Sequence, residues 1–197
     1  MSNIVKLWLT VILLFVLGVS TPVEAQINKV LIQASGLTCS MCSNSIHKSL
    51  KTIAAVATVN ANIKNSTFEI SFNPNSSIDI DELKKKVEDA GFFVARFEIQ
   101  INVNEINVED DAHVEWDNKL FHFIHVGQRK LKGMVTLLVL DKGYVSDKEF
   151  KRNARYTTMG CYQTGYKGAC CNDKTSSTLQ RIYHVRNQFY QQAGKID

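Results

Sequence analysis

Two cysteines separated by two residues, Cys39 and Cys42, form the most distinctive chemical pattern in the sequence, Cys39-Ser40-Met41-Cys42. This spacing lets both sulfurs turn to one side and bind a single ion. Two thiolates without a third strong ligand suit a soft ion of low coordination number. Cu(I) is the first choice, and Hg(II), Ag(I), Cd(II) and Zn(II) are alternatives. We therefore predict Cys39 and Cys42 as metal ligands, with a disulfide between them as the alternative resting state.

A second group of cysteines, Cys161, Cys170 and Cys171, lies in a glycine-rich segment that predicts a loop. In an exported protein this pattern favours a disulfide from Cys161 to Cys170 or Cys171, because adjacent cysteines pair with strained geometry. The alternative is a second thiolate metal site. No histidine stands at chelating spacing beside the loop, which favours the disulfide.

The histidines of the second half give no metal-binding pattern in the sequence. His122 and His125 fall on one predicted strand at odd spacing, so their side chains point to opposite faces of it. We expect each of them to be a surface or packed residue. His113 and His184 carry no signal of their own.

Residues 27–99 contain the elements that position the first cysteine pair. The predicted order is strand 27–34, a helix from 41, strands 56–63 and 67–72, a helix over 80–90 and strand 93–99. Alternating apolar residues indicate the strands, and apolar stripes at helical spacing indicate the helices. This βαββαβ order is the ferredoxin-like pattern. Cys39 then lies in the loop after the first strand and Cys42 in the opening turn of a helix, where unpaired N–H groups favour a thiolate.

The segment Gly36-Leu37-Thr38-Cys39-Ser40-Met41-Cys42 resembles the Gly-Met-Thr-Cys-x-x-Cys loop of heavy-metal-associated domains. Asp89-Ala90-Gly91-Phe92 resembles the second signature of this family, a glycine followed by an aromatic residue. The resemblance covers residues 27–99. It implies that Cys39 and Cys42 bind the metal, that Leu37 and Phe92 support the site from the core, and that a metal-transporting P-type ATPase or another metal-binding protein is the partner.

Residues 100–197 match no pattern that we recognise and predict a second, strand-rich α+β domain. Apolar runs indicate strands over 120–126 and 134–140, and Ser146 begins a short helix through Asn153. Residues 175–178 are expected to cap a C-terminal helix. Its apolar stripe comprises Leu179, Ile182, Tyr183, Arg186 and Phe189 or Tyr190.

Composition and the first residues indicate an exported globular protein. The chain has 197 residues, of which 45% are hydrophobic and 21% charged, which excludes a wholly disordered protein. Its net charge of +4 is spread along the chain, which argues against nucleic-acid binding. Lys6, the apolar run 7–19 and Val23-Glu24-Ala25 predict a signal peptide over residues 1–25, with an uncleaved anchor as the alternative. The cleaved chain would contain no membrane span and would be exported, to the periplasm or cell envelope if the protein is bacterial.

The sequence therefore predicts a metal-binding protein rather than an enzyme. Its expected role is that of an exported Cu(I) chaperone or scavenger, which passes the ion on by thiolate exchange. A thiol–disulfide oxidoreductase is one alternative, although Thr38 precedes the cysteine pair and Ser40-Met41 separates it, where thioredoxin-like enzymes usually carry Trp and Pro. An adaptor without metal transfer is the other.

Overall fold

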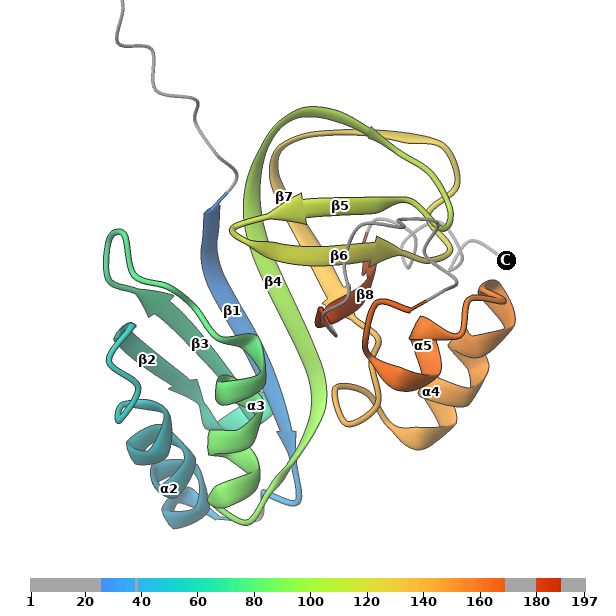
Figure 1. Cartoon of the computed structure of the whole chain (residues 1–197). Coiled ribbons are helices and arrows are strands. Elements are labelled where there is room, and N and C mark those ends of the chain that lie inside the picture. The colour runs from blue at the N-terminus through green and yellow to red at the C-terminus, as the bar shows by residue number, and fades with distance from the viewer. Residues whose placement is uncertain (1–25, 38, 169–179, 189–197) are drawn as a thin grey trace, which may run out of the picture.

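The computed structural model describes residues 26–37, 39–168 and 180–188 (Figure 1). The first half contains β1 (Gln26–Ser35), α2 (Ser40–Leu50), β2 (Val56–Asn62), η1 (Ile63–Asn65), β3 (Thr67–Phe72), α3 (Ile80–Asp89) and β4 (Phe93–Val108). The second half contains β5 (His113–Trp116), β6 (Lys119–Phe123), β7 (Arg129–Val139), α4 (Asp147–Asn153), η2 (Ala154–Tyr156), α5 (Cys161–Thr164) and β8 (Ile182–Asn187). The ferredoxin-like order predicted for residues 27–99 is confirmed. In the part of the chain that the structure describes, no helix is long and apolar enough to cross a membrane.

One sheet of eight strands runs through both halves, in the order β2-β3-β1-β4-β7-β8-β6-β5. Strand β4 is 16 residues long and joins the halves, because it pairs with β1 along one side and with β7 along the other. Glu98, for example, faces Leu31 of β1 and Leu138 of β7. The sheet therefore continues across residue 100, where the sequence suggests a change of domain.

Local sequence explains the elements of the first half. In β1 the alternating side chains of Val30, Ile32 and Ala34 are buried, which is the period of a strand covered on one face. Helix α3 begins at Asp79, whose carboxylate accepts hydrogen bonds from two backbone N–H groups of the first turn. The helix ends before Gly91, which adopts a φ of +89° that other residues rarely take. Both helices of this half lie against the same part of the sheet (Figure 1).

The predicted C-terminal helix is wrong for the residues that the structure describes. Residues 182–187 form strand β8, which pairs parallel with β6 and antiparallel with β7. All six side chains are buried, so both faces of the strand are covered, and the polar residues His184, Arg186 and Asn187 are buried like the apolar ones. Ile182 and Arg186 are four positions apart, and this spacing fits a stripe on one face of a helix as well as it fits one face of a strand. The other residues assigned to that helix, 175–179, 189 and 190, lie outside the described residues.

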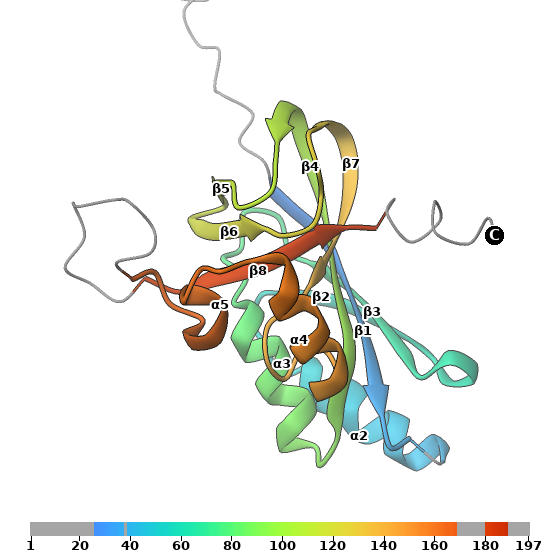
Figure 2. The same cartoon turned by 90° about the vertical axis from the view of Figure 1, so that its right-hand side faces the viewer.

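Contacts between side chains also join the two halves. Asp81 on α3 accepts hydrogen bonds from Tyr144, from Tyr183 at 3.0 Å and from Nε of Arg181 at 2.9 Å. Burial acts to raise the pKa of Asp81, but the bonds from Arg181 and Tyr144 outweigh it and the pKa is lowered. Tyr144 also packs edge-to-face on Phe97 of β4, with ring centroids 5.1 Å apart. The first turn of α3 is thus joined to the second half through Asp81, and Figure 2 shows α4 and α5 of that half on the side nearer the viewer, in front of α3.

Candidate metal sites

The first cysteine pair lies at the junction of β1 and α2, as the sequence predicts. Cys39 is exposed and occupies the N-cap of α2, and Cys42 is half-buried in the first turn. The two sulfurs lie 2.7 Å apart on the same side of the loop, and Cys39 Sγ accepts a hydrogen bond from the backbone N–H of Cys42 at 3.3 Å. Metal–sulfur bonds are about 2.3 Å long, so the sulfurs must separate to hold an ion between them. The exposed position of Cys39 leaves room for that movement.

Two hydrogen bonds stabilise a thiolate at Cys39. The largest effect on its pKa comes from the thiol of Cys42, which donates to the sulfur, and the next from the Cys42 backbone N–H. Both lower the pKa of Cys39 below that of an ordinary cysteine. The first turn of α2 contains no acidic residue that would oppose this effect. A thiolate is the form of cysteine that binds metal and attacks disulfides.

Replacing Cys42 by alanine is therefore expected to raise the pKa of Cys39, because the substitution removes the thiol donor. Cys39 of the unaltered, reduced protein should react with iodoacetamide at lower pH than an ordinary cysteine. In Cys42→Ala the rise in reactivity should shift to higher pH. Mass spectrometry of peptides modified at a series of pH values measures this, and Ser40→Ala serves as the control. Equal pH dependence in all three proteins would contradict the assignment.

The predicted supporting residues lie beneath this loop. Leu37 and Phe92 are half-buried and pack against the main core. A Cβ placed on Gly36 would lie 4.0 Å from the Phe92 ring, so the ring lies beside the loop. Met41 between the cysteines is 81% exposed. The base of the loop is thus anchored in the core while its tip faces solvent.

The structure corrects the expectation that no histidine accompanies Cys161. His113 pairs with His122 across β5 and β6, and His122 pairs with His184 across β6 and β8. Cys161 does not lie in a plain loop, as the glycines suggested, but begins the short helix α5. Its sulfur lies 3.6 Å from Nδ1 of His122 and 3.5 Å from Nε2 of His184. His125 lies apart from this group, in agreement with the sequence, and stacks on Tyr156.

Of the histidines around Cys161, His122 and His184 are fully buried and His113 is partly exposed. Burial lowers the pKa of His122 to about 4, although its bond to Asp111 opposes the shift. Burial is also the largest cause of the lowered pKa of His113. The ring of His122 is therefore neutral at pH 7. Cys170 and Cys171 lie outside the described residues, so the disulfide from Cys161 to one of them stays a prediction.

The sequence does not reveal this second group, because strand pairing creates it. His184 stands in the segment assigned to a helix, and His113 and His122 are nine positions apart. The sequence offers one signal for this group: polar and apolar residues alternate in β5, and β5 and β6 each contain one of the histidines. The register between the strands is not readable from that alternation.

The ferredoxin-like fold with two cysteines at the start of its first helix defines a class of small metal-binding domains. The family model of the heavy-metal-associated domain matches residues 31–93. These residues therefore form a heavy-metal-associated domain, and the match does not extend into the second half.

Curated and solved relatives each match less than half of the chain. The probable copper-transporting ATPase HMA5 of Arabidopsis thaliana is 30% identical over 80 residues, which cover 41% of this chain and 8% of the relative. This chain thus matches only a small part of the length of that relative. Among solved structures, the N-terminal domain of a potential copper-translocating P-type ATPase from Bacillus subtilis is 30% identical, covering 34% of this chain and 82% of that domain at a TM-score of 0.31. The yeast copper transporter domain CCC2A is 25% identical, covering 33% and 88% at a TM-score of 0.31.

Proposed function

We propose that this is an exported protein that binds Cu(I) at Cys39 and Cys42 and passes it to another metal-binding protein by thiolate exchange. The observation that carries the proposal is the pair of sulfurs on one side of an exposed loop, with hydrogen bonds that favour the thiolate of Cys39. The choice of copper is supported by the relative that is 30% identical over 80 residues, a probable copper-transporting ATPase. Export is supported by the signal-like residues 1–25.

Transfer requires no catalytic base. A thiolate of the incoming partner forms a bond to the ion, and the bond to Cys39 or Cys42 then breaks, so the oxidation state of the metal does not change. The lowered pKa of Cys39 means that less free energy is needed to remove its proton before the ion binds than for an ordinary cysteine. Exposure of Cys39 and Met41 gives the partner access to the ion. A similar domain of a metal-transporting P-type ATPase is the partner that this exchange suits.

A thiol–disulfide oxidoreductase is the second candidate, because the same geometry favours it. The sulfurs lie 2.7 Å apart, and a cysteine of lowered pKa at a helix start is the attacking group in such enzymes. Both candidates use Cys39 and Cys42. They differ in what the pair exchanges, which is a metal ion in one and two electrons in the other.

Anaerobic titration of the reduced protein with Cu(I), Hg(II) and Zn(II) tests the proposal. The protein carries serine at positions 161, 170 and 171, so that Cys39 and Cys42 are its only thiols. Native mass spectrometry should show one Cu(I) per chain that withstands a strong Cu(I) chelator and moves to an added heavy-metal-associated domain. Preference for Hg(II) or Zn(II) would contradict the choice of copper. Failure to bind Cu(I), together with catalysed reduction of insulin disulfides, would support the oxidoreductase.

A further inference from the structure

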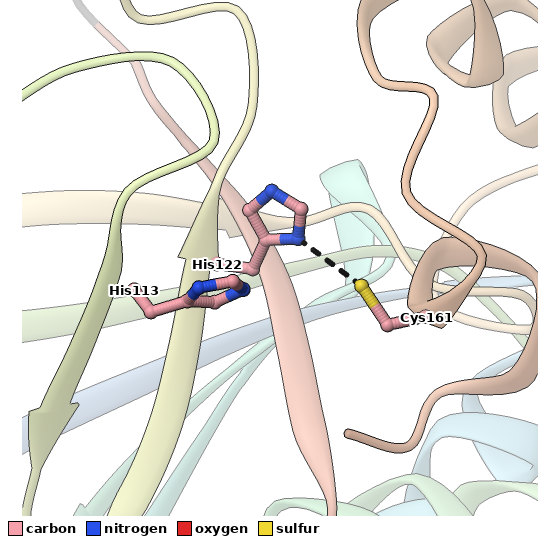
Figure 3. A group of neighbouring side chains, drawn as sticks. All are labelled: His113, His122 and Cys161. Carbon is pink, nitrogen blue, oxygen red and sulfur yellow. Dashed lines mark hydrogen bonds between the residues drawn. The ribbon is translucent and has the colours of Figure 1, made fainter. Parts of the chain in front are cut away.

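We propose that Cys161, His122, His184 and His113 form a second metal site, which binds an ion that accepts both thiolate and imidazole ligands, copper or zinc. The site lies in the second half of the chain and is independent of the function proposed for Cys39 and Cys42. Figure 3 shows Cys161 approaching the ring of His122, with His113 beside it. His184 is placed by its own contact to the same sulfur.

Three neighbouring strands place the histidines in one row. His113, His122 and His184 are direct partners in the register of β5, β6 and β8. Directly paired residues on adjacent strands project to the same face of a sheet. The ring centroids are accordingly 4.6 Å apart for His113 and His122 and 4.9 Å apart for His122 and His184. Cys161 reaches this row from α5.

Two separations between ligand atoms match those around a tetrahedral ion. With bonds of about 2.3 Å to sulfur and about 2.05 Å to nitrogen, tetrahedral angles place the two ligand atoms about 3.6 Å apart. Sγ of Cys161 lies 3.6 Å from His122 Nδ1 and 3.5 Å from His184 Nε2. One ligand atom each of His113, His122 and Cys161 lies within 4.8 Å of the other two. His184 joins these three residues through its contact to the Cys161 sulfur.

Carboxylates hold the two buried histidines in the orientation that metal ligands need. Nε2 of His122 lies 2.9 Å from Asp111 Oδ1, and Nδ1 of His184 lies 2.9 Å from Asp141 Oδ1. Each carboxylate thus accepts from one ring nitrogen and leaves the other nitrogen directed at the sulfur. Asp141 is itself fixed by the backbone N–H of His184. A carboxylate behind a ligating histidine is a recurring feature of metal sites.

Burial favours an ion over a substrate at this sulfur. Cys161 with His122 and Asp111 also has the order of a nucleophile, a base and an orienting acid. However, Cys161 is 1% exposed, and His122 and His184 are fully buried. A substrate molecule therefore cannot reach the sulfur. A nucleophile of this kind also needs one histidine, whereas two lie within 3.6 Å of the thiol. A single metal ion accounts for all of these groups.

The test uses the reduced chain from residue 26 onward. In this parent protein serine replaces Cys39 and Cys42, so that the first site is absent. Zn(II), Cu(I) and Co(II) are added separately and counted by native mass spectrometry, and Co(II) reports a thiolate ligand through its charge-transfer absorption. We expect one ion per chain, bound at least 100-fold more weakly after Cys161→Ser or His122→Asn. His113→Asn, at the partly exposed end of the row, should weaken binding with little effect on folding. The stronger of the Zn(II) and Cu(I) affinities decides the metal.

Further variants distinguish binding at this site from binding elsewhere in the chain. Asp111→Asn should weaken binding about 10- to 100-fold through the orientation of His122. His47→Gln, outside the group, and the pair Cys170→Ser with Cys171→Ser should leave binding unchanged. The proposal is overturned if the parent binds none of the three ions. It is also overturned if binding depends on Cys170 and Cys171 but not on His113, or if Co(II) shows no thiolate absorption.

Discussion

Replacing both Cys39 and Cys42 by serine is expected to abolish tight Cu(I) binding by the heavy-metal-associated domain. Serine hydroxyls are neutral, hard ligands and do not replace thiolates on a soft ion. The affinity should fall at least about 1,000-fold, which corresponds to about 4 kcal/mol. Competition with a strong Cu(I) chelator measures the loss. The comparison is made in the protein that lacks Cys161, Cys170 and Cys171, so that no other thiol binds the ion.

The same substitutions should leave the fold unchanged. Cys39 is exposed and Cys42 half-buried, and neither belongs to the main core. Far-UV circular dichroism of the reduced, metal-free double variant should match that of the parent, and Ser40→Ala is the matched control for binding. Undiminished competition by the double variant would exclude the pair as the site. Loss of secondary structure would show instead that the loop is needed for folding.

The second large effect is expected for Phe97→Ala, which should destabilise the protein by about 3–5 kcal/mol. Phe97 is fully buried in the main core and packs on Tyr144 of the second half. It also lies on β4, which pairs with strands of both halves. We therefore expect one cooperative unfolding transition in urea, shifted as a whole to lower concentration. Phe93→Ala on the same strand is the control, because Phe93 is 73% exposed and its loss should change stability by less than about 0.5 kcal/mol.

Two separate transitions would contradict this expectation. If only one of them moved in Phe97→Ala, the halves would unfold independently despite the shared strand. The domain boundary predicted between residues 99 and 100 would then separate two units that unfold independently. Fluorescence of Trp116 in β5 and the thiol reactivity of Cys42 in α2 report on the two halves separately.

The first half was predictable because its signals are local. Strand β1 alternates and α3 carries a single apolar stripe, so each element covers one face and its periodicity is visible. The second half lacks this property. Strand β8 is buried on both faces, and three of its six residues, His184, Arg186 and Asn187, are polar yet buried, so polarity does not mark an exposed face there. The element type there is decided by its neighbours β6 and β7, which the sequence does not identify.

The two candidate sites differ in the same way. Cys39 and Cys42 are three positions apart on one loop, so spacing was enough to place both sulfurs together. His184 and Cys161 are brought together by α5 and by the parallel pairing of β6 with β8. Parallel pairing joins segments that are distant in the sequence, and no spacing rule describes it. The carboxylates behind the histidines are fixed by the same tertiary contacts.

The continuous strand β4 also limits how an ion can travel within the molecule. Two modules joined by a flexible linker can approach one another, because such a linker behaves as a random coil. Here β4 and β7 separate β1 from β8, and three steps between strands amount to about 14 Å. The cysteine loop after β1 and the histidine row on the far strands therefore cannot share an ion while the sheet is intact. Any exchange between them must pass through a separate carrier, which makes its rate dependent on the concentration of that carrier.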